Sequence, residues 1–131
     1  MARILQAIAG LAALGLAGCV GGGEDEKSTL AGAGGKPIVT VRVTTDEHFL
    51  SPQYTRLVTP GTYKLQVENE GTLSHSLTVE HDGRTLETPP LAPGERYEAG
   101  IDLTDTGEYT IYCPVEGHRD KGMAGLITVG L

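Results

Sequence analysis

From residue 37 onward, apolar and polar residues alternate with a period of two, the pattern of strands that bury one face. In residues 38–44, for example, Val39, Val41 and Val43 share one face and polar residues occupy the other. Similar runs lie at residues 54–59, 63–68, 73–80, 96–103, 109–113 and 126–129, separated by turns rich in Gly, Pro and Asn. No segment keeps a helical period over three turns. The pattern predicts an all-β fold of seven to eight short strands, a β-sandwich or small barrel.

The N-terminus follows a different pattern. Arg3 precedes an apolar run over residues 4–17, which is short for a membrane span and typical of a signal peptide. The run ends in Leu-Ala-Gly-Cys at residues 16–19. This ending resembles the lipobox of bacterial lipoproteins, in which the Cys is lipidated and becomes the new N-terminus. We therefore expect a lipid on Cys19 that anchors the protein to the membrane, outside the cytoplasm. The alternative is an ordinary secretory signal that ends in a Cys by chance.

Residues 20–36 read VGGGEDEKSTLAGAGGK, a stretch of small and polar residues without apolar periodicity. A chain of this composition and length is a flexible tether with an average reach of about 20–25 Å. The predicted organisation is a signal peptide at residues 1–18, a lipidated Cys and linker at 19–36, and one folded domain at 37–131.

Charge and cysteine content narrow the function classes. The chain of 131 residues carries 17 acidic and 10 basic side chains, a net charge of −7. Nucleic-acid binding is disfavoured, because it needs a basic face. After processing at Cys19, the chain would keep one Cys, Cys113, and one Met, Met123. An intramolecular disulfide is then excluded, and a lone thiol outside the cytoplasm needs another role.

The candidate chemistry lies in one segment near the C-terminus. Cys113, His118 and Met123 recur every five residues between two predicted strands, in a stretch interrupted by Gly. Thiolate and thioether are soft ligands and imidazole is borderline, so the set favours copper over magnesium, calcium or manganese. A metal-free arrangement of a buried Cys, a solvated His and a core Met is the simplest alternative. A three-ligand zinc site is another, but the Met at the fourth position argues against it.

A trigonal copper site needs a second imidazole. His75 is the best candidate, because we expect it to point inward from a strand face shared with Leu73 and Leu77. A buried ring nitrogen is costly unless it has a partner. His48, among charged residues at a strand end, and His81, in a solvated turn, are weaker candidates.

These residues resemble the cupredoxins, a family of small blue-copper proteins with a Greek-key β-sandwich. Supporting segments lie at residues 91–95, 107–109 and 122–125. Four residues separate Cys113 from His118, and four more separate His118 from Met123. This spacing is similar to that of the longer-loop members, such as auracyanins and rusticyanins. The resemblance implies one type 1 copper ion, with His75, Cys113 and His118 as strong ligands and Met123 as the weak axial ligand.

The resemblance also implies a function. A cupredoxin transfers single electrons between redox proteins, here on the extracytoplasmic side of a membrane. It has no small-molecule substrate and no catalytic residue, because protein ligands fill the metal site. Four His without a His-x-His pair cannot build a trinuclear copper oxidase site, and a binuclear site needs a second Cys in the loop. A lipoprotein that stores or delivers copper is the alternative function.

Two further expectations concern the surroundings of the metal. The family often has Asn after the first His, where this chain has Ser76. We expect backbone N–H groups of Ser76 and Val115 to donate to the Cys113 sulfur and to favour a relatively high redox potential. We also expect an apolar surface patch around His118, where electrons would leave: Pro114, Val115, Gly117, Ala124, Phe49, Leu50 and Pro52.

Overall fold

The computed structural model describes residues 29–32 and 34–130. The expected signal peptide, Cys19 and linker residues 20–28 lie outside the described residues. Within the described part, no helix is both long and apolar enough to cross a membrane.

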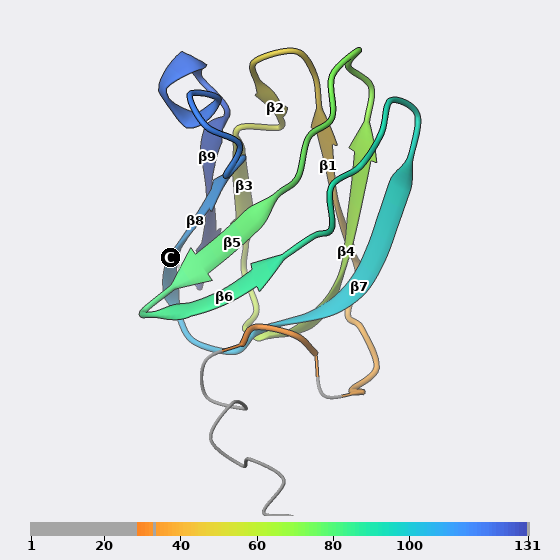
Figure 1. Ribbon diagram of the computed structural model, residues 1–131. Coiled ribbons are helices and arrows are strands. Elements are labelled where there is room, and N and C mark those ends of the chain that lie inside the picture. Colours follow the sequence, from red (N-terminus) through yellow and green to blue (C-terminus); the bar gives the residue numbers. More distant parts are fainter. Residues whose placement is uncertain (1–28, 33, 131) are drawn as a thin grey trace, which may run out of the picture.

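Two β-sheets pack face to face to form a sandwich (Figure 1). The first sheet has the order β2 (Leu50–Ser51), β1 (Thr40–Thr45), β4 (Gly61–Asn69) and β7 (Arg96–Leu103). The second has the order β3 (Tyr54–Leu57), β9 (Ala124–Val129), β8 (Gly107–Tyr112), β5 (Thr78–His81) and β6 (Arg84–Glu87). The pairs β1–β4 and β3–β9 are parallel, and the remaining pairs are antiparallel. A 3-10 turn, η2 (Arg119–Lys121), lies in the loop between β8 and β9.

The predicted all-β sandwich is confirmed, and β7 occupies the predicted residues. The part of the chain that is described has nine strands, because the short strands β2 and β6 join the expected set. The largest difference is at residues 73–80. Here β5 begins only at Thr78, and Leu73 is 46% exposed rather than buried beside His75.

The alternation of the sequence produces the core. Along β4, Tyr63, Leu65 and Val67 point inward, while their neighbours are only partly buried. On the opposite sheet, Tyr109 and Ile111 of β8 do the same. Each sheet thus contributes every second side chain to a common interior, as expected for two packed sheets.

Part of the predicted linker lies against the folded domain. Leu30, placed in the predicted linker, is fully buried and belongs to the hydrophobic core. Its N–H donates to the Thr85 carbonyl of β6 at 2.9 Å, and its carbonyl accepts from Asp102 of β7 at 2.8 Å. Since β6 and β7 are edge strands of the two sheets, this segment closes the sandwich between them. Because Leu30 is the one large apolar residue in a stretch of small residues, the hydrophobic periodicity of the sequence could not predict its burial.

Candidate metal centre

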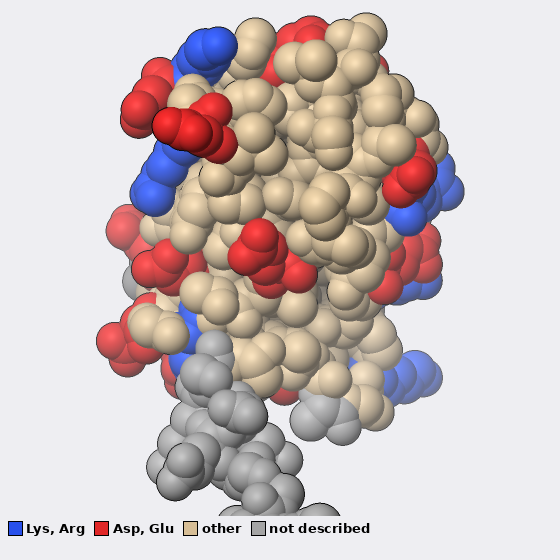
Figure 2. Space-filling view, viewed as in Figure 1, with Lys and Arg blue, Asp and Glu red and all other residues tan. Residues whose placement is uncertain are grey.

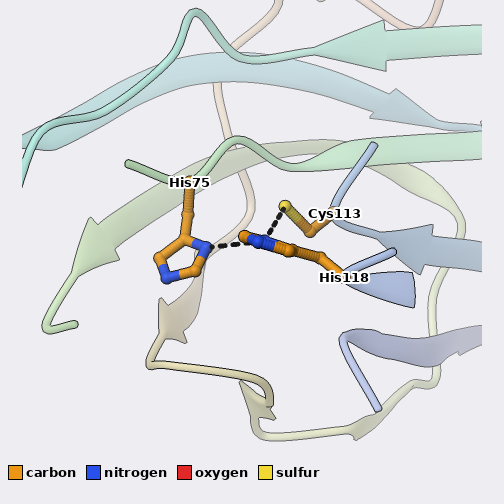
Figure 3. Close-up of side chains that lie close together, drawn as sticks. All are labelled: His75, Cys113 and His118. Atoms are coloured by element: carbon orange, nitrogen blue, oxygen red, sulfur yellow. Dashed lines mark hydrogen bonds between the residues drawn. The ribbon is translucent and has the colours of Figure 1, made fainter. Parts of the chain in front are cut away.

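Three of the predicted ligands converge at one end of the sandwich. His75, Cys113 and His118 each offer a ligand atom, and these atoms lie within 4.8 Å of one another. Figure 3 shows the three side chains pointing toward a common point. The Nδ1 atoms of His75 and His118 are 3.2 Å apart, and the Cys113 Sγ is 3.6 Å from Nδ1 of His118.

The pairing of β5 with β8 brings His75 to Cys113. Thr78 at the start of β5 lies opposite Tyr112 at the end of β8. In an antiparallel pair, the residues that precede one strand and those that follow the other lie at the same end of the sheet. Cys113 directly follows Tyr112, and His75 lies three residues before Thr78, so both come to this end of the sheet. His75 is held there by a two-way backbone pair with Leu91, at 3.1 and 2.7 Å, instead of lying within a strand as predicted.

The loop between β8 and β9 brings His118 back over Cys113. The loop is closed at its base, where the Cys113 N–H donates to the Met123 carbonyl at 3.0 Å. Two glycines allow the chain to turn within so short a loop. Gly117 and Gly122 have φ of +79° and +115°, in the region that side chains disfavour. They flank His118 and η2, so the local sequence determines the turn.

Met123 lies at the same end of the sandwich. Its N–H donates to the His118 carbonyl at 3.1 Å, and its carbonyl accepts from Cys113. The side chain is fully buried. The backbone of Met123 is thus tied to both of the loop ligands, and its side chain lies in the interior.

Burial differs among these side chains. His75, Cys113 and Met123 are fully buried, whereas His118 is only partly buried. Burial lowers the pKa of His75, and the neighbouring ring of His118 lowers it further. His75 is thus favoured in the neutral form, whose unprotonated nitrogen can bind a metal. Its other nitrogen, Nε2, is buried without a hydrogen-bond partner among the described residues.

The donor set fits a single metal ion. Ligands bound to one ion by bonds of roughly 2.0–2.3 Å lie about 3–4 Å apart. The observed separations of 3.2 and 3.6 Å are of this size. Two imidazole nitrogens and a sulfur, with a buried thioether nearby, form a soft set that favours copper. These four residues would hold the ion.

The expected bonds to the sulfur are not seen. Within the described residues, the hydrogen-bonding neighbour of the Cys113 sulfur is His118, and neither Ser76 nor Val115 donates to it. Ser76 is buried, and the Val115 carbonyl instead accepts from the His118 N–H at 3.0 Å. The expected high redox potential stays a prediction.

The remaining histidines also differ from expectation. His48 lies against His118 in an edge-to-face arrangement, with ring centroids 5.7 Å apart. His81, expected to be solvated, stacks on Tyr109 with centroids 4.1 Å apart, and its Nδ1 lies 2.7 Å from the Glu108 carbonyl. His48 thus borders the metal centre and His81 does not.

The expected surface patch is formed in part. Phe49 and Val115 are exposed, and so are Pro114, Gly117 and Pro52. Leu50 is not, because its side chain points into the core and is 1% exposed. The partly buried His118 lies beside exposed loop residues, so the centre approaches the surface at this point.

Asn69 is a positioning residue that the sequence analysis missed. This fully buried amide donates to the carbonyls of Leu73 and Leu91, at 2.7 and 2.8 Å. Its oxygen accepts from the Gly71 N–H at 2.9 Å and from Thr45 at 3.3 Å. Since Leu91 is the backbone partner of His75, Asn69 links β1 and β4 to the segment that carries this ligand. The alternation of Tyr63, Leu65 and Val67 continues to Asn69, so the periodicity already marked a polar residue as buried.

Replacing Asn69 by Ala is expected to reduce the free energy of unfolding by about 1–3 kcal/mol, because buried polar partners lose their hydrogen bonds. Denaturant unfolding of the metal-free protein measures this loss. The control is Gln66→Ala on the same strand, where hydrogen bonds to Arg42 and Glu98 are exposed to solvent. We expect a change within about 0.5 kcal/mol there. Equal effects of the two substitutions would contradict the positioning role.

Comparison with known proteins supports the fold. No protein-family profile matches the sequence, and no curated protein matches it. Among solved structures, auracyanin B matches with a TM-score of 0.68 and 19% identity, over 78% of this chain and 96% of that one. A dithionite-reduced auracyanin from Roseiflexus castenholzii matches with a TM-score of 0.63 and 15% identity, over 72% of this chain and 98% of that one. Auracyanin A, a "blue" copper protein from Chloroflexus aurantiacus, matches with a TM-score of 0.60 and 16% identity, over 72% of this chain and 99% of that one. The described chain therefore has the cupredoxin fold of the auracyanins, with the His, Cys and His side chains gathered at one end of the sandwich.

Proposed function

We propose that this protein is a copper-binding electron carrier, anchored to a membrane through a lipid on Cys19 and facing the extracytoplasmic side. The observation that carries the electron-transfer proposal is the convergence of His75, Cys113 and His118 within 4.8 Å, in a cupredoxin fold. Bound copper supplies a one-electron couple between its cupric and cuprous forms.

The protein side chains perform separate tasks in this proposal. His75, Cys113 and Met123, which are fully buried, would hold the ion together with His118, and backbone bonds fix the positions of these residues. His118 reaches toward the surface and provides the path for the electron. Because four protein ligands leave no open position for a substrate, we assign no catalytic residue.

The partners would be redox proteins that dock near His118. Exposed Val115 and Phe49 offer apolar contacts there. On the face shown in Figure 2, charged side chains gather along both sides, and the area between them is mostly uncharged except for an acidic group near its centre. The net charge of −7 favours partners with neutral or basic surfaces.

The anchor rests on the sequence of residues 1–19, a short apolar run that ends in a lipobox-like Leu-Ala-Gly-Cys. A lipidated N-terminal Cys with more than one acyl chain gives stable membrane attachment. Mass spectrometry of the protein purified from its producing cells would test this part of the proposal. Lipid mass on a chain that begins at Cys19 supports it, and an unmodified N-terminus elsewhere contradicts it.

Copper titration tests the electron-carrier proposal. Residues 20–131 would be titrated with copper(II), and visible absorption and electron paramagnetic resonance recorded. We expect an intense visible band at one equivalent, which a reductant bleaches and an oxidant restores. A colourless protein with weakly held, exchangeable copper would contradict the electron-carrier function and favour copper storage or delivery. That alternative is disfavoured at present because the chain from Cys19 onward has a single Met and no open Met-rich loop.

Replacing Met123 by Leu is expected to leave copper bound and to raise the redox potential. Leu fills a similar volume but removes the weak axial sulfur, whose donation tunes the potential of such sites. Voltammetry of the copper-loaded wild type and variant at equal pH measures the shift. If the variant no longer binds copper, Met123 has a structural role and does not tune the potential.

A further inference from the structure

An apolar patch lies at the end of the sandwich opposite the metal centre. It consists of Ile38, Val39 and Val58, which are 49%, 53% and 80% exposed, with exposed Pro60 beside them. Ile38 and Val39 lie beside the turn that follows Val58 and contains Pro60. The Ile38 N–H donates to Thr62 at 2.8 Å, and its side chain lies against Gly61, the residue after Pro60.

Strand direction places this patch far from copper. Cys113 follows the last residue of β8, whereas Gly107 at its first residue lies opposite Val129. The next residue, Gly130, donates to the Leu57 carbonyl at 2.8 Å, directly before Val58. The six residues of β8 therefore separate the patch from Cys113, roughly 20 Å at the rise of an extended strand.

The chain that leads to Cys19 leaves the domain at this same end. Leu30 is bonded to Asp102, and Asp102 lies opposite Thr62, the second residue of β4. In Figure 1 the start of the described chain lies below the sandwich, and the β8–β9 loop with η2 lies at its top. Ten residue steps from Cys19 to Thr29 span at most about 33–36 Å even when fully extended. An anchor at Cys19 thus keeps this end close to the bilayer.

The charges around the patch suit a lipid surface. Two exposed basic residues, Lys36 and Arg56, each lie two positions from a patch residue. Two acidic residues at this end already have partners. Asp102 accepts from Thr62 at 2.7 Å, and Asp105 forms an ion pair with Arg84. Interfacial binding combines apolar burial with attraction of basic groups to anionic lipids, and both are available here.

We propose that Ile38, Val39 and Val58 dock on the bilayer that holds the anchor, so that the metal centre faces away from the membrane toward soluble partners. This inference rests on the proposed lipid anchor. A lipid surface is the partner of the patch in this inference, because the chain that leads to the anchor leaves the fold beside these residues.

Tryptophan fluorescence can test the orientation, because the chain contains no Trp. The copper-loaded chain of residues 19–131 would be coupled through the Cys19 thiol to a maleimide phospholipid, since Cys113 is fully buried. Vesicles would contain equal parts of phosphatidylcholine and phosphatidylglycerol, with or without brominated acyl chains. The variants are Val58→Trp at the patch and Val115→Trp at the metal end.

We expect brominated lipid to cause a loss of emission from Val58→Trp and none from Val115→Trp. Adding Ile38→Ser and Val39→Ser to Val58→Trp should restore the emission. Equal quenching at both ends, no quenching at Val58→Trp, or quenching that survives the two serine substitutions would each overturn the inference. The chemical coupling separates this test from the lipid anchor itself, which mass spectrometry of the cellular protein decides.

Discussion

Replacing Cys113 by Ser is expected to abolish the intense visible absorption of the copper-loaded protein. The band arises from charge transfer between a thiolate and copper, and Cys113 is the cysteine at the centre. The Ser hydroxyl is a hard, neutral donor that copper in this environment binds poorly. Absorption and electron paramagnetic resonance spectra after addition of one equivalent of copper(II) measure the loss.

Two controls separate loss of the ligand from loss of the fold. Cys113 is fully buried, so unfolding of the metal-free Ser variant should be compared with that of the wild type. His81→Ala serves as a matched histidine control. His81 stacks on Tyr109 and lies near Gly107, at the end of β8 away from Cys113, so this variant should keep the band. A Cys113→Ser protein that remained intensely coloured would contradict the assignment of the thiolate.

Replacing Leu30 by Ala is expected to lower the free energy of unfolding by about 2–5 kcal/mol, the usual cost of truncating a buried leucine. Leu30 is fully buried between the edge strands of the two sheets, where a cavity would separate β6 from β7. Denaturant unfolding of residues 20–131 without metal measures the effect. Val39→Ala, at a side chain that is 53% exposed, is the control and should change stability by less than about 0.5 kcal/mol.

A truncation series gives a second measure of the same segment. A chain that begins at residue 37 loses the Leu30 side chain and its backbone bonds to Thr85 and Asp102. It also loses the 2.9 Å bond from the Gly32 N–H to the Gly100 carbonyl. We expect it to unfold at lower denaturant concentration than a chain that begins at residue 29. Equal midpoints for the two chains would show that this segment adds nothing to the fold.

The burial of Leu30 also bears on the proposed lipid anchor. The sequence suggested a tether over residues 20–36, yet residues 29–32 are bonded to the edges of both sheets. The connection between Cys19 and the domain is therefore shorter than the composition implied. A short connection would restrict the orientations of an anchored domain on the membrane, which supports the proposed docking of the end that lies away from the metal centre.

Local patterns in the sequence were sufficient for the fold class and for most of the candidate site. Alternation with a period of two predicted β4, β7 and β8 because each strand must bury one face and expose the other. The five-residue spacing of Cys113, His118 and Met123 predicted a metal loop because these residues share one short connection. Strand alternation and ligand spacing both involve residues that are close together in the chain, so they can be read from the sequence directly.

Tertiary structure alone decided which distant residues meet. His75 reaches Cys113 through the pairing of β5 with β8, and its backbone pair with Leu91 replaces the strand that the alternation suggested. Asn69 holds this arrangement through hydrogen bonds to Leu73 and Leu91, and Leu30 joins the two sheets from within an apparent linker. Each of these contacts connects segments that are unrelated in the sequence pattern. Periodicity records which face of a strand is buried, but not what lies against it, because that depends on how the whole chain packs.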